Sequence, residues 1–263
     1  MDIPTRLPTL FLSHGSPMLA LEDSPAGRFL DGLGGALPWP KAVVVASAHF
    51  MTDRPMLGGH VQPHTVHDFG GFPEPLYRIA YPAPGAPDLA EQIAQRLADA
   101  GLNPRVRENH GLDHGVWVPL LRMYPRADIP VVPLSVMPHG TAAQHYALGQ
   151  ALAPLRDEGV LVIGSGGFVH NLGDLDWAHK DGPMPAWAHE FAEWMHARLA
   201  AHDTDALMDW QQRAPNARHA HPTVEHLMPL FVALGAAGAS PGVRTLHRSH
   251  EYGSLALDAF AFD

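Results

Sequence analysis

Three short apolar runs in this chain each lead into a histidine. The first leads to His14, the second to His49 and the third to His170. The three runs, with the histidines included, are residues 8–17, 41–50 and 159–171. Apolar runs of this length, bounded by turn residues, predict buried strands. Because the carboxyl ends of parallel strands meet at one edge of a sheet, we expect the three imidazoles to converge.

Hydrophobic periodicity and turn residues predict alternating strands and helices along the rest of the chain. Residues 42–47 form a continuous apolar, mostly β-branched run, which is typical of a strand covered on both faces. The further expected strands are 76–80, 129–136, 243–246 and 254–260, and the expected helices are a short one opened by Ser24-Pro25, then 87–100, 116–123, 141–156, 185–200, 206–210 and 222–234. The predicted fold class is α/β, a single domain over residues 1–263 with a central mixed, largely parallel β-sheet flanked by helices on both faces.

Two segments rich in glycine or proline need a separate interpretation. Residues 51–75 contain His60, His64 and His67 among prolines and glycines. Such a composition cannot sustain a helix and predicts a long loop, which we interpret as a mobile lid rather than a metal site. Residues 164–167 read Gly-Ser-Gly-Gly after a strand, but they lack the glycine spacing of a dinucleotide site. They are therefore expected to form a tight turn.

Composition narrows the possible partners and ligands. The 263 residues contain 17 Lys plus Arg and 27 Asp plus Glu, a formal net charge of -10, which argues against nucleic acid and anionic membranes as partners. No apolar run reaches the about 18 residues of a membrane span, and the N-terminal residues lack the pattern of a signal peptide, so we expect a cytoplasmic protein. The chain has no cysteine and 19 histidines, which leaves imidazole and carboxylate as the strong metal ligands.

The strand-end histidines are the first candidate ligands. Three imidazoles, or two and a carboxylate, suit iron(II), zinc or manganese. A further candidate is the segment from His221 to His226, whose two histidines would lie about 140° apart on a helix and so cannot both reach one ion. One of these two histidines, or Glu225, can still face the site. A helix N-terminus capped by His221, with Glu225 in solvent, is the structural alternative.

Several ordered motifs add a resemblance to a known family. They are Ser13-His-Gly-Ser-Pro-Met18, Ser47-Ala-His49, Asp68-Phe-Gly-Gly-Phe-Pro73, Leu76-Tyr77, Tyr81-Pro-Ala-Pro-Gly85, Gly111-Leu-Asp-His-Gly115, Val169-His-Asn-Leu172, His221-Pro-Thr-Val-Glu-His226, Pro229-Leu230 and Gly253-Ser-Leu255. With these motifs the chain resembles the class III extradiol ring-cleaving dioxygenases, in particular the 4,5-DOPA extradiol dioxygenase-like branch. The likeness runs from about Pro8 to the C-terminus.

The resemblance implies a metal centre and roles for five histidines. Iron(II) or zinc(II), one ion per chain, would be held by His14, His49 and His226. His170 would act nearby as acid-base residue or extra ligand, and His114 would line the pocket. A related branch uses glutamate as its third ligand, which makes Glu225 the alternative to His226. The chain has Leu19 and Phe50 where members often have asparagine and tryptophan, which affects substrate orientation more than the metal.

The implied reaction opens a catechol-type ring with O2 to give a muconic semialdehyde-type product in one catalytic domain. The competing interpretations are a zinc hydrolase that uses a metal-bound water, with Glu225 as its base, and a non-catalytic histidine-rich metal-binding protein. No G-x-S-x-G motif supports a serine nucleophile at Ser13, Ser16 or Ser165. The expected partners are a small aromatic diol and O2, and the sequence carries no signal for an oligomeric state. The candidate cations for a substrate carboxylate are Arg78, Arg218 and Arg248.

Overall fold

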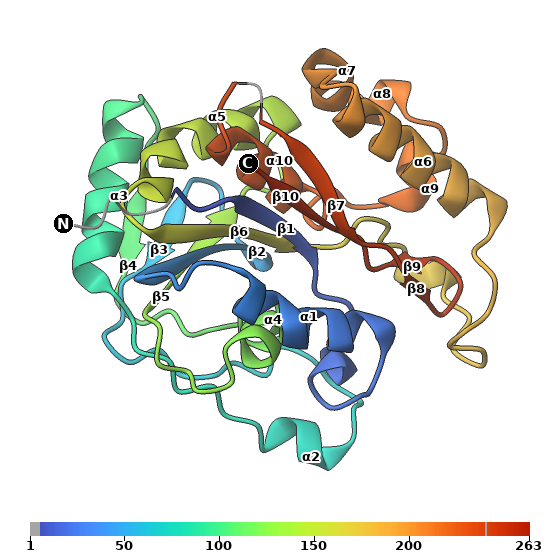
Figure 1. Cartoon of the computed structure of the whole chain (residues 1–263), viewed down its shortest axis with the longest axis horizontal. Helices are drawn as coiled ribbons and strands as arrows, with labels where there is room; N and C mark the ends of the chain where they lie inside the picture. Colours follow the sequence, from blue (N-terminus) through green and yellow to red (C-terminus); the bar gives the residue numbers. More distant parts are fainter. Residues whose placement is uncertain (1–5, 240) are drawn as a thin grey trace.

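The structure, a computed structural model, describes residues 6–239 and 241–263. Its main sheet contains β1 (Thr9–Ser13), β2 (Ala42–Met51), β3 (Met56–Gly58), β4 (Arg105–Arg107), β5 (Val131–Val136), β6 (Val160–Gly166), β7 (Val243–His247) and β10 (Ala259–Phe262). The spatial order of these strands is β4-β3-β5-β2-β6-β1-β10-β7, and the sheet crosses the centre of the molecule in Figure 1. β8 (His250–Glu251) and β9 (Leu255–Ala256) form a separate two-stranded sheet.

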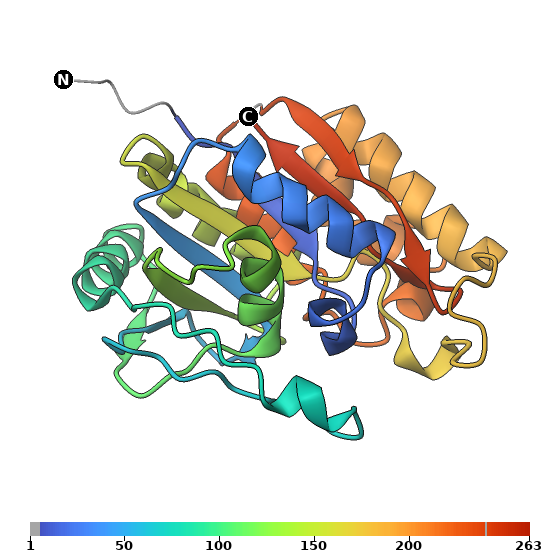
Figure 2. The ribbon, with the colours of Figure 1, turned by 60° about the horizontal axis from the view of Figure 1, so that its bottom comes forward.

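The central strands β5, β2, β6 and β1 run parallel to one another. On one side β3 pairs antiparallel with β5, and on the other side β10 lies antiparallel between β1 and β7. The sheet is therefore mixed and largely parallel, as predicted. Figure 2 shows β10 and β7 next to β1, which comes from the opposite end of the chain.

Helices cover both faces of the sheet, which confirms the predicted α/β fold class. The helical segments are α1 (Pro25–Ala36), α2 (Glu74–Tyr77), α3 (Pro87–Asp99), α4 (His114–Met123), α5 (Ala142–Leu152), α6 (Ala186–Ala200), α7 (Thr204–Met208), α8 (Trp210–Arg213), α9 (Ala217–Ala220) and α10 (Met228–Ala236), with 3-10 turns η1 (Pro17–Ala20), η2 (Ala153–Arg156) and η3 (Leu172–Asp174). α1 and α4 pack on one face, and α3, α5 and α10 on the other. Across residues 6–239 and 241–263, every helix is too short or too polar to cross a bilayer.

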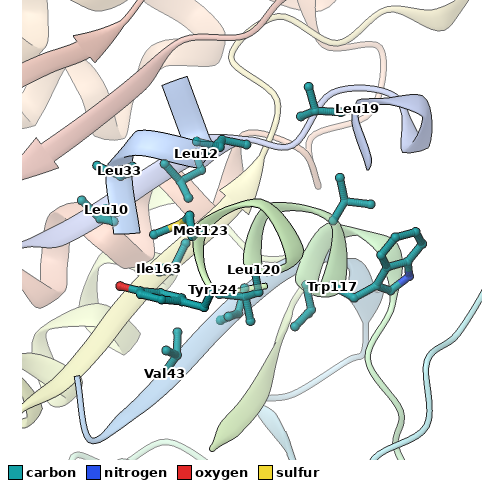
Figure 3. Packing of buried hydrophobic residues seen from close by; sticks show 14 of the residues in the cluster. Leu10, Leu12, Leu19, Leu33, Val43, Trp117, Leu120, Met123, Tyr124 and Ile163 are labelled. Carbon is teal, nitrogen blue, oxygen red and sulfur yellow. The ribbon is translucent and has the colours of Figure 1, made fainter. Parts of the chain in front are cut away.

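The two core clusters on either side of β2 follow from the alternation of side chains along that strand. In β2, Val43 and Val45 join the cluster under α1 and α4, whereas Val44 and Ala46 join the cluster under α5 and α10. Figure 3 shows the first cluster, with Val43 and the α4 residues Trp117 and Leu120 filling the layer. Both faces are apolar, so the strands read as continuous hydrophobic runs in the sequence.

The start of α1 has the cap chemistry that the sequence predicts, and the start of α5 has a cap that was not predicted. Ser24 caps α1 by accepting a hydrogen bond from the Gly27 N–H at 3.1 Å, with Pro25 in the first helical position. Thr141 and Gln144 form a reciprocal capping box at the start of α5. The predicted helices at 87–100 and 185–200 appear as α3 and α6 with end shifts of one residue or less.

Other predicted elements are wrong. Residues 76–80 form no strand, because Pro73 and Pro75 set the backbone for the short helix α2 instead. The helix expected at 222–234 begins only at Met228, since Pro229 lacks the N–H that a helix interior needs and is tolerated in a first turn. His221 and His226 therefore do not lie on one helix, and the 140° separation does not apply. The strands β3 and β4 were not predicted because each has only three residues.

Candidate metal centre

Three histidines gather at the carboxyl edge of the parallel strands. His14 directly follows β1, and His49 lies near the end of β2, where the register with β5 shifts between Ser47 and Met51. An irregularity of this kind re-aims a side chain at the end of a strand. β6 is the only strand between β1 and β2 in the sheet order of the described residues. The third histidine, His226, arrives from the turn that precedes α10.

The Nε2 atoms of these three rings point toward one another. Nε2 of His49 lies 3.1 Å from Nε2 of His14 and 3.3 Å from Nε2 of His226. The candidate ligand atoms of all three residues lie within 4.8 Å of one another. Two nitrogens bound at about 2.0–2.1 Å to one tetrahedral ion would be roughly 3.4 Å apart. The spacing therefore fits three imidazole ligands of a single cation.

The other ring nitrogen of His14 is held by a buried serine at the end of β6. The Ser165 hydroxyl donates to the carbonyl oxygen of Gly115 at 2.5 Å, so its oxygen is left to accept. It accepts from the Nδ1–H of His14 at 3.0 Å. This chain of hydrogen bonds fixes the tautomer of His14 with a free lone pair on Nε2, which is the form that binds a metal.

A carboxylate lies behind each of the other two rings, hydrogen-bonded to His226 and in close range of His49. Glu225 Oε1 accepts from Nδ1–H of His226 at 3.0 Å, and Nδ1 of His49 faces Asp68 Oδ2 at 3.4 Å. All three Nε2 lone pairs then face one point with no hydrogen between them. A cation satisfies such a set of acceptors, and outer carboxylates of this kind orient metal-binding histidines.

Burial keeps the three imidazoles neutral. It lowers the pKa of His14 and of His226 well below the usual value for histidine, and the neighbouring histidines lower both further. Burial, together with repulsion from His114, lowers the pKa of His49 to about 3 although Asp68 opposes the change. Neutral imidazole is the form that ligates iron, zinc or copper.

His114 and Asp68 form a second pair beside the first three rings. The backbone N–H and the ring Nδ1–H of His114, at the start of α4, both donate to Asp68 Oδ1 at 3.0 Å. The rings of His114 and His49 have centroids 3.8 Å apart. Burial disfavours the charged form of Asp68, but the hydrogen bonds and charge of His114 outweigh it and lower the pKa of Asp68 to about 2. One carboxylate thus orients both histidines.

His170 lies beyond the end of β6 and stacks on His226. The two ring centroids are 3.4 Å apart and the planes differ by 6°. Burial lowers the pKa of His170 to about 4, while Glu225 acts in the opposite direction. The imidazole of His170 is therefore neutral near pH 7 and able to accept a proton.

All five histidines line one cavity of about 240 Å³. The other lining residues are Gly15, Ser16, Pro17, Asp68, Phe69, Phe72, Leu172, Leu175, Trp177 and Leu255. This volume lies just below the about 300–1,000 Å³ range of sites for drug-sized ligands. It therefore suits a small ligand with a single ring.

The comparisons with known proteins assign this arrangement to a family. Residues 8–257 match the family described as the catalytic LigB subunit of aromatic ring-opening dioxygenase. The chain belongs to the LigB family. Two relatives are named 4,5-DOPA dioxygenase extradiol: that of Beta vulgaris is 43% identical over 97% of this chain and 96% of its own length, and that of Escherichia coli (strain K12) is 41% identical over 96% and 93%.

A solved structure agrees with the LigB assignment. The crystal structure of an uncharacterized protein from Escherichia coli K12 shares 35% identity, superposes with a TM-score of 0.83, and covers 98% of this chain and 100% of that chain. The resemblance expected from the sequence motifs is confirmed, and the matches support an extradiol ring-cleaving dioxygenase.

Two glycines expected in a tight turn lie in a strand of this LigB chain. There they allow the backbone that carries His226 to pack closely against the strand. Gly164 and Gly166 belong to β6, and a Cβ on either would lie 2.0 Å from the carbonyl oxygen of Pro229 or His226, respectively. Only glycine allows the approach of this backbone to the strand. His221 is not one of the three converging histidines: its Nε2 donates to the carbonyl oxygen of Phe168 at 3.1 Å. It follows α9 as the C-terminal cap of that helix and does not cap the N-terminus of α10, as the structural alternative expected.

The remaining sequence candidates lie outside the cluster. His60, His64 and His67 belong to none of the candidate metal-ligand groups among the described residues. The role of their loop as a mobile lid stays a prediction. Of the three candidate arginines, Arg78 pairs with Glu74 and Arg248 with Glu193 and Asp258, and neither these two nor Arg218 lines the cavity.

Sequence reasoning missed the residues that orient the histidines. In the sequence, Asp68 stands out only as part of a motif. Glu225 stands out as a candidate ligand or base, and Ser165 only as a candidate nucleophile. Glu225 could have been found as the neighbour of His226, and Asp68 as a carboxylate in a histidine-rich loop. Ser165 had no such signal, because a serine inside a buried strand looks the same whether or not it meets a histidine.

Proposed function

We propose that this protein is an iron(II)-dependent extradiol dioxygenase whose single catalytic domain, residues 1–263, opens the ring of a catechol. Both atoms of O2 would enter the product, a muconic semialdehyde, so the reaction needs no external reductant. The family assignment supports the reaction class. The observation that carries the metal dependence is the set of three Nε2 atoms facing one point, each ring held from Nδ1.

His14, His49 and His226 would hold the ion, and the donor set fits it because neutral imidazole suits iron(II). When bound there, iron(II) would supply the redox chemistry of O2 and the Lewis acidity that makes a catechol hydroxyl easier to ionise. Zinc(II) would fit the same nitrogens but has no redox chemistry. We therefore propose iron for the ring-opening reaction.

His170 is proposed as the base that takes a catechol proton. It is neutral near pH 7, lines the cavity and is fixed by its stacking on His226. A positioned base of this kind typically contributes about 10²–10⁴-fold to a rate. His114 is proposed to orient the diol, because its Nδ1–H is committed to Asp68 and its ring lines the cavity beside His49.

The zinc hydrolase interpretation has less support than the dioxygenase. A hydrolase of that kind needs a free carboxylate to activate the metal-bound water. Glu225, the carboxylate next to a proposed ligand, instead accepts the Nδ1–H of His226 and the Thr223 hydroxyl at 2.9 Å. In this geometry Glu225 orients the ring of the proposed metal ligand His226.

The test is anaerobic reconstitution of the metal-free protein with iron(II) or with zinc(II), followed by catechol and then air. The iron form should consume O2 and give a yellow ring-opened product, and the zinc form should do neither. Turnover by the zinc form, or tight iron binding without any O2 uptake, would contradict the proposal.

A further inference from the structure

Much of the cavity lining consists of large apolar side chains. We call this set the apolar wall, and it comprises Phe69, Phe72, Leu172, Leu175, Trp177 and Leu255. Leu172 and Trp177 are 55% and 60% exposed, unusually high for large apolar residues. Exposed apolar surface next to a site is characteristic of a place where a ligand's own apolar surface will be covered.

Apart from the metal ion proposed at the histidines, the cavity offers no positive charge to a ligand. Among the lining residues that the structure describes, none is lysine or arginine, and Asp68 is the one carboxylate. A carboxylate on a ring substituent would lose its hydration there without gaining an ion pair, and it would also be repelled by Asp68. The net charge of -10 over the whole chain adds a weaker repulsion at long range.

The lysine closest in sequence to the wall is already neutralised. Lys180 hydrogen-bonds Glu22, and its Nζ lies 3.3 Å from Glu251 Oε1. Two carboxylates around one ammonium leave a net negative charge at this position. Lys180 therefore does not substitute for the cation that the cavity lacks.

The apolar wall is held in place on both sides. Trp177 packs on Tyr252 with ring centroids 5.0 Å apart, and Tyr252 is tied to the same segment by backbone hydrogen bonds to Asp176 and Lys180 of 3.0 and 2.7 Å. On the other side Phe69 meets Phe72 edge to face, with centroids 5.4 Å apart. The wall is therefore a formed surface, against which a ring substituent can be positioned.

We infer that this cavity selects catechols whose ring substituent is uncharged and apolar, and that it discriminates against catechols bearing a carboxylate. The inference rests on the proposed function, since the histidines hold the diol end and the wall meets the substituent. Two relatives are named for DOPA, an amino acid whose carboxylate would find no cation among the lining side chains of this chain.

The test uses a matched pair of ligands, 3,4-dihydroxyphenylpropionate and its methyl ester, which differ in the charge of the substituent and by one methyl group. Binding of each to the iron-loaded protein is measured by calorimetry without O2, and turnover is measured separately with O2. The ester should bind at least about tenfold more tightly and show the lower KM. Equal or tighter binding of the acid would overturn the inference.

The binding measurement distinguishes failure of this inference from failure of the proposed function. Should both ligands bind with the expected ratio but without ring opening, the proposed function fails and the inference about the wall stands. Should unsubstituted catechol be opened while the acid binds as well as the ester, the reverse holds.

A charge placed in the wall should reverse the preference. Leu172→Arg supplies a cation at an exposed wall position, and Val61→Arg supplies the same cation at a 65% exposed residue outside the cavity lining. The ratio of acid to ester affinity should rise about tenfold or more in Leu172→Arg and stay unchanged in Val61→Arg. An unchanged ratio in a folded Leu172→Arg protein, checked by circular dichroism, would overturn the inference.

Discussion

The cavity is lined by two sets of side chains, the histidines and the apolar wall, and the two sets are held in place in different ways. The histidine floor, defined as His14, His49 and His226, rests on buried strands or on the turn packed against them, and each ring has a polar partner behind it. The apolar wall comes mainly from loop and turn segments, and its one side chain with a polar atom is Trp177, which carries an indole N–H. The floor fixes a geometry that chemistry requires, whereas the wall offers only shape and the absence of charge.

This difference predicts that substitutions in the two sets affect different kinetic constants. Alterations of the floor should reduce metal binding or turnover for every substrate alike. Alterations of the wall should change KM and the ranking of substrates while leaving kcat nearly constant, because the wall contacts the substituent and not the reacting diol.

The largest effect is expected from removing a floor ligand. His49→Ala deletes the ring whose Nε2 faces both of the other two, so iron binding should fall by more than about 10³-fold and turnover should disappear. Iron content by atomic absorption and O2 uptake measure the two losses. His189→Ala, at an exposed histidine of α6, is the matched control and should behave as the parent. Full iron content in His49→Ala would contradict the assignment of this residue.

A smaller loss is expected when the base is replaced but the stacking is kept. His170→Phe retains an aromatic ring against His226 and removes the proton acceptor, so kcat should fall about 10²–10⁴-fold with normal iron content. Stopped-flow absorbance of the catechol and of the yellow product measures the change. Turnover near the parent rate would show that another group takes the proton.

Removing the support behind a ligand should cost less than removing the ligand itself. Ser165→Ala leaves the Nδ1 of His14 without its acceptor, so iron affinity should fall about 10–100-fold. Competition with a chelator measures the affinity. Ser135→Ala, at an equally buried serine on β5 that contacts none of the floor histidines, controls for loss of a buried hydroxyl and should keep the parent affinity.

The smallest effect is expected at the wall. Trp177→Ala removes apolar area without touching the diol, so KM for apolar catechols should rise about three- to tenfold and kcat should hold. Steady-state kinetics with the methyl ester measures both constants. Trp39→Ala, a similarly exposed tryptophan outside the cavity lining, should change neither constant. A fall in kcat with constant KM would mean that the wall also shapes the reacting geometry.

Much of the fold could be predicted because the central strands are buried on both faces and therefore continuous in hydrophobicity. The errors occurred where local signals conflict. Pro229 lies inside a run that looks helical, and it moves the start of α10 to Met228. In β3 and β4 the pairing comes from distant residues, such as Met56 with Arg105, and a window of three residues cannot reveal it.

The site could be predicted only in part, because contacts between distant segments leave no local pattern in the sequence. His14 and His49 follow from their strands, because a strand end determines where the next side chain points. His226 follows from a turn, and only the family resemblance identified it. The partners of these rings depend on close approach between segments far apart in the sequence, such as Ser165 beside His14, which no periodicity reports.

The place of β10 in the sheet has a consequence for how the protein is made. β1 leads directly into His14 and has β6 on one side and β10 on the other, so both of its neighbours are synthesised long after it. Until residues 259–262 emerge from the ribosome, β1 presents an unpaired apolar edge, which is a hazard for aggregation. A premature stop codon just upstream of β10 should therefore give an insoluble polypeptide and not a slightly shorter enzyme.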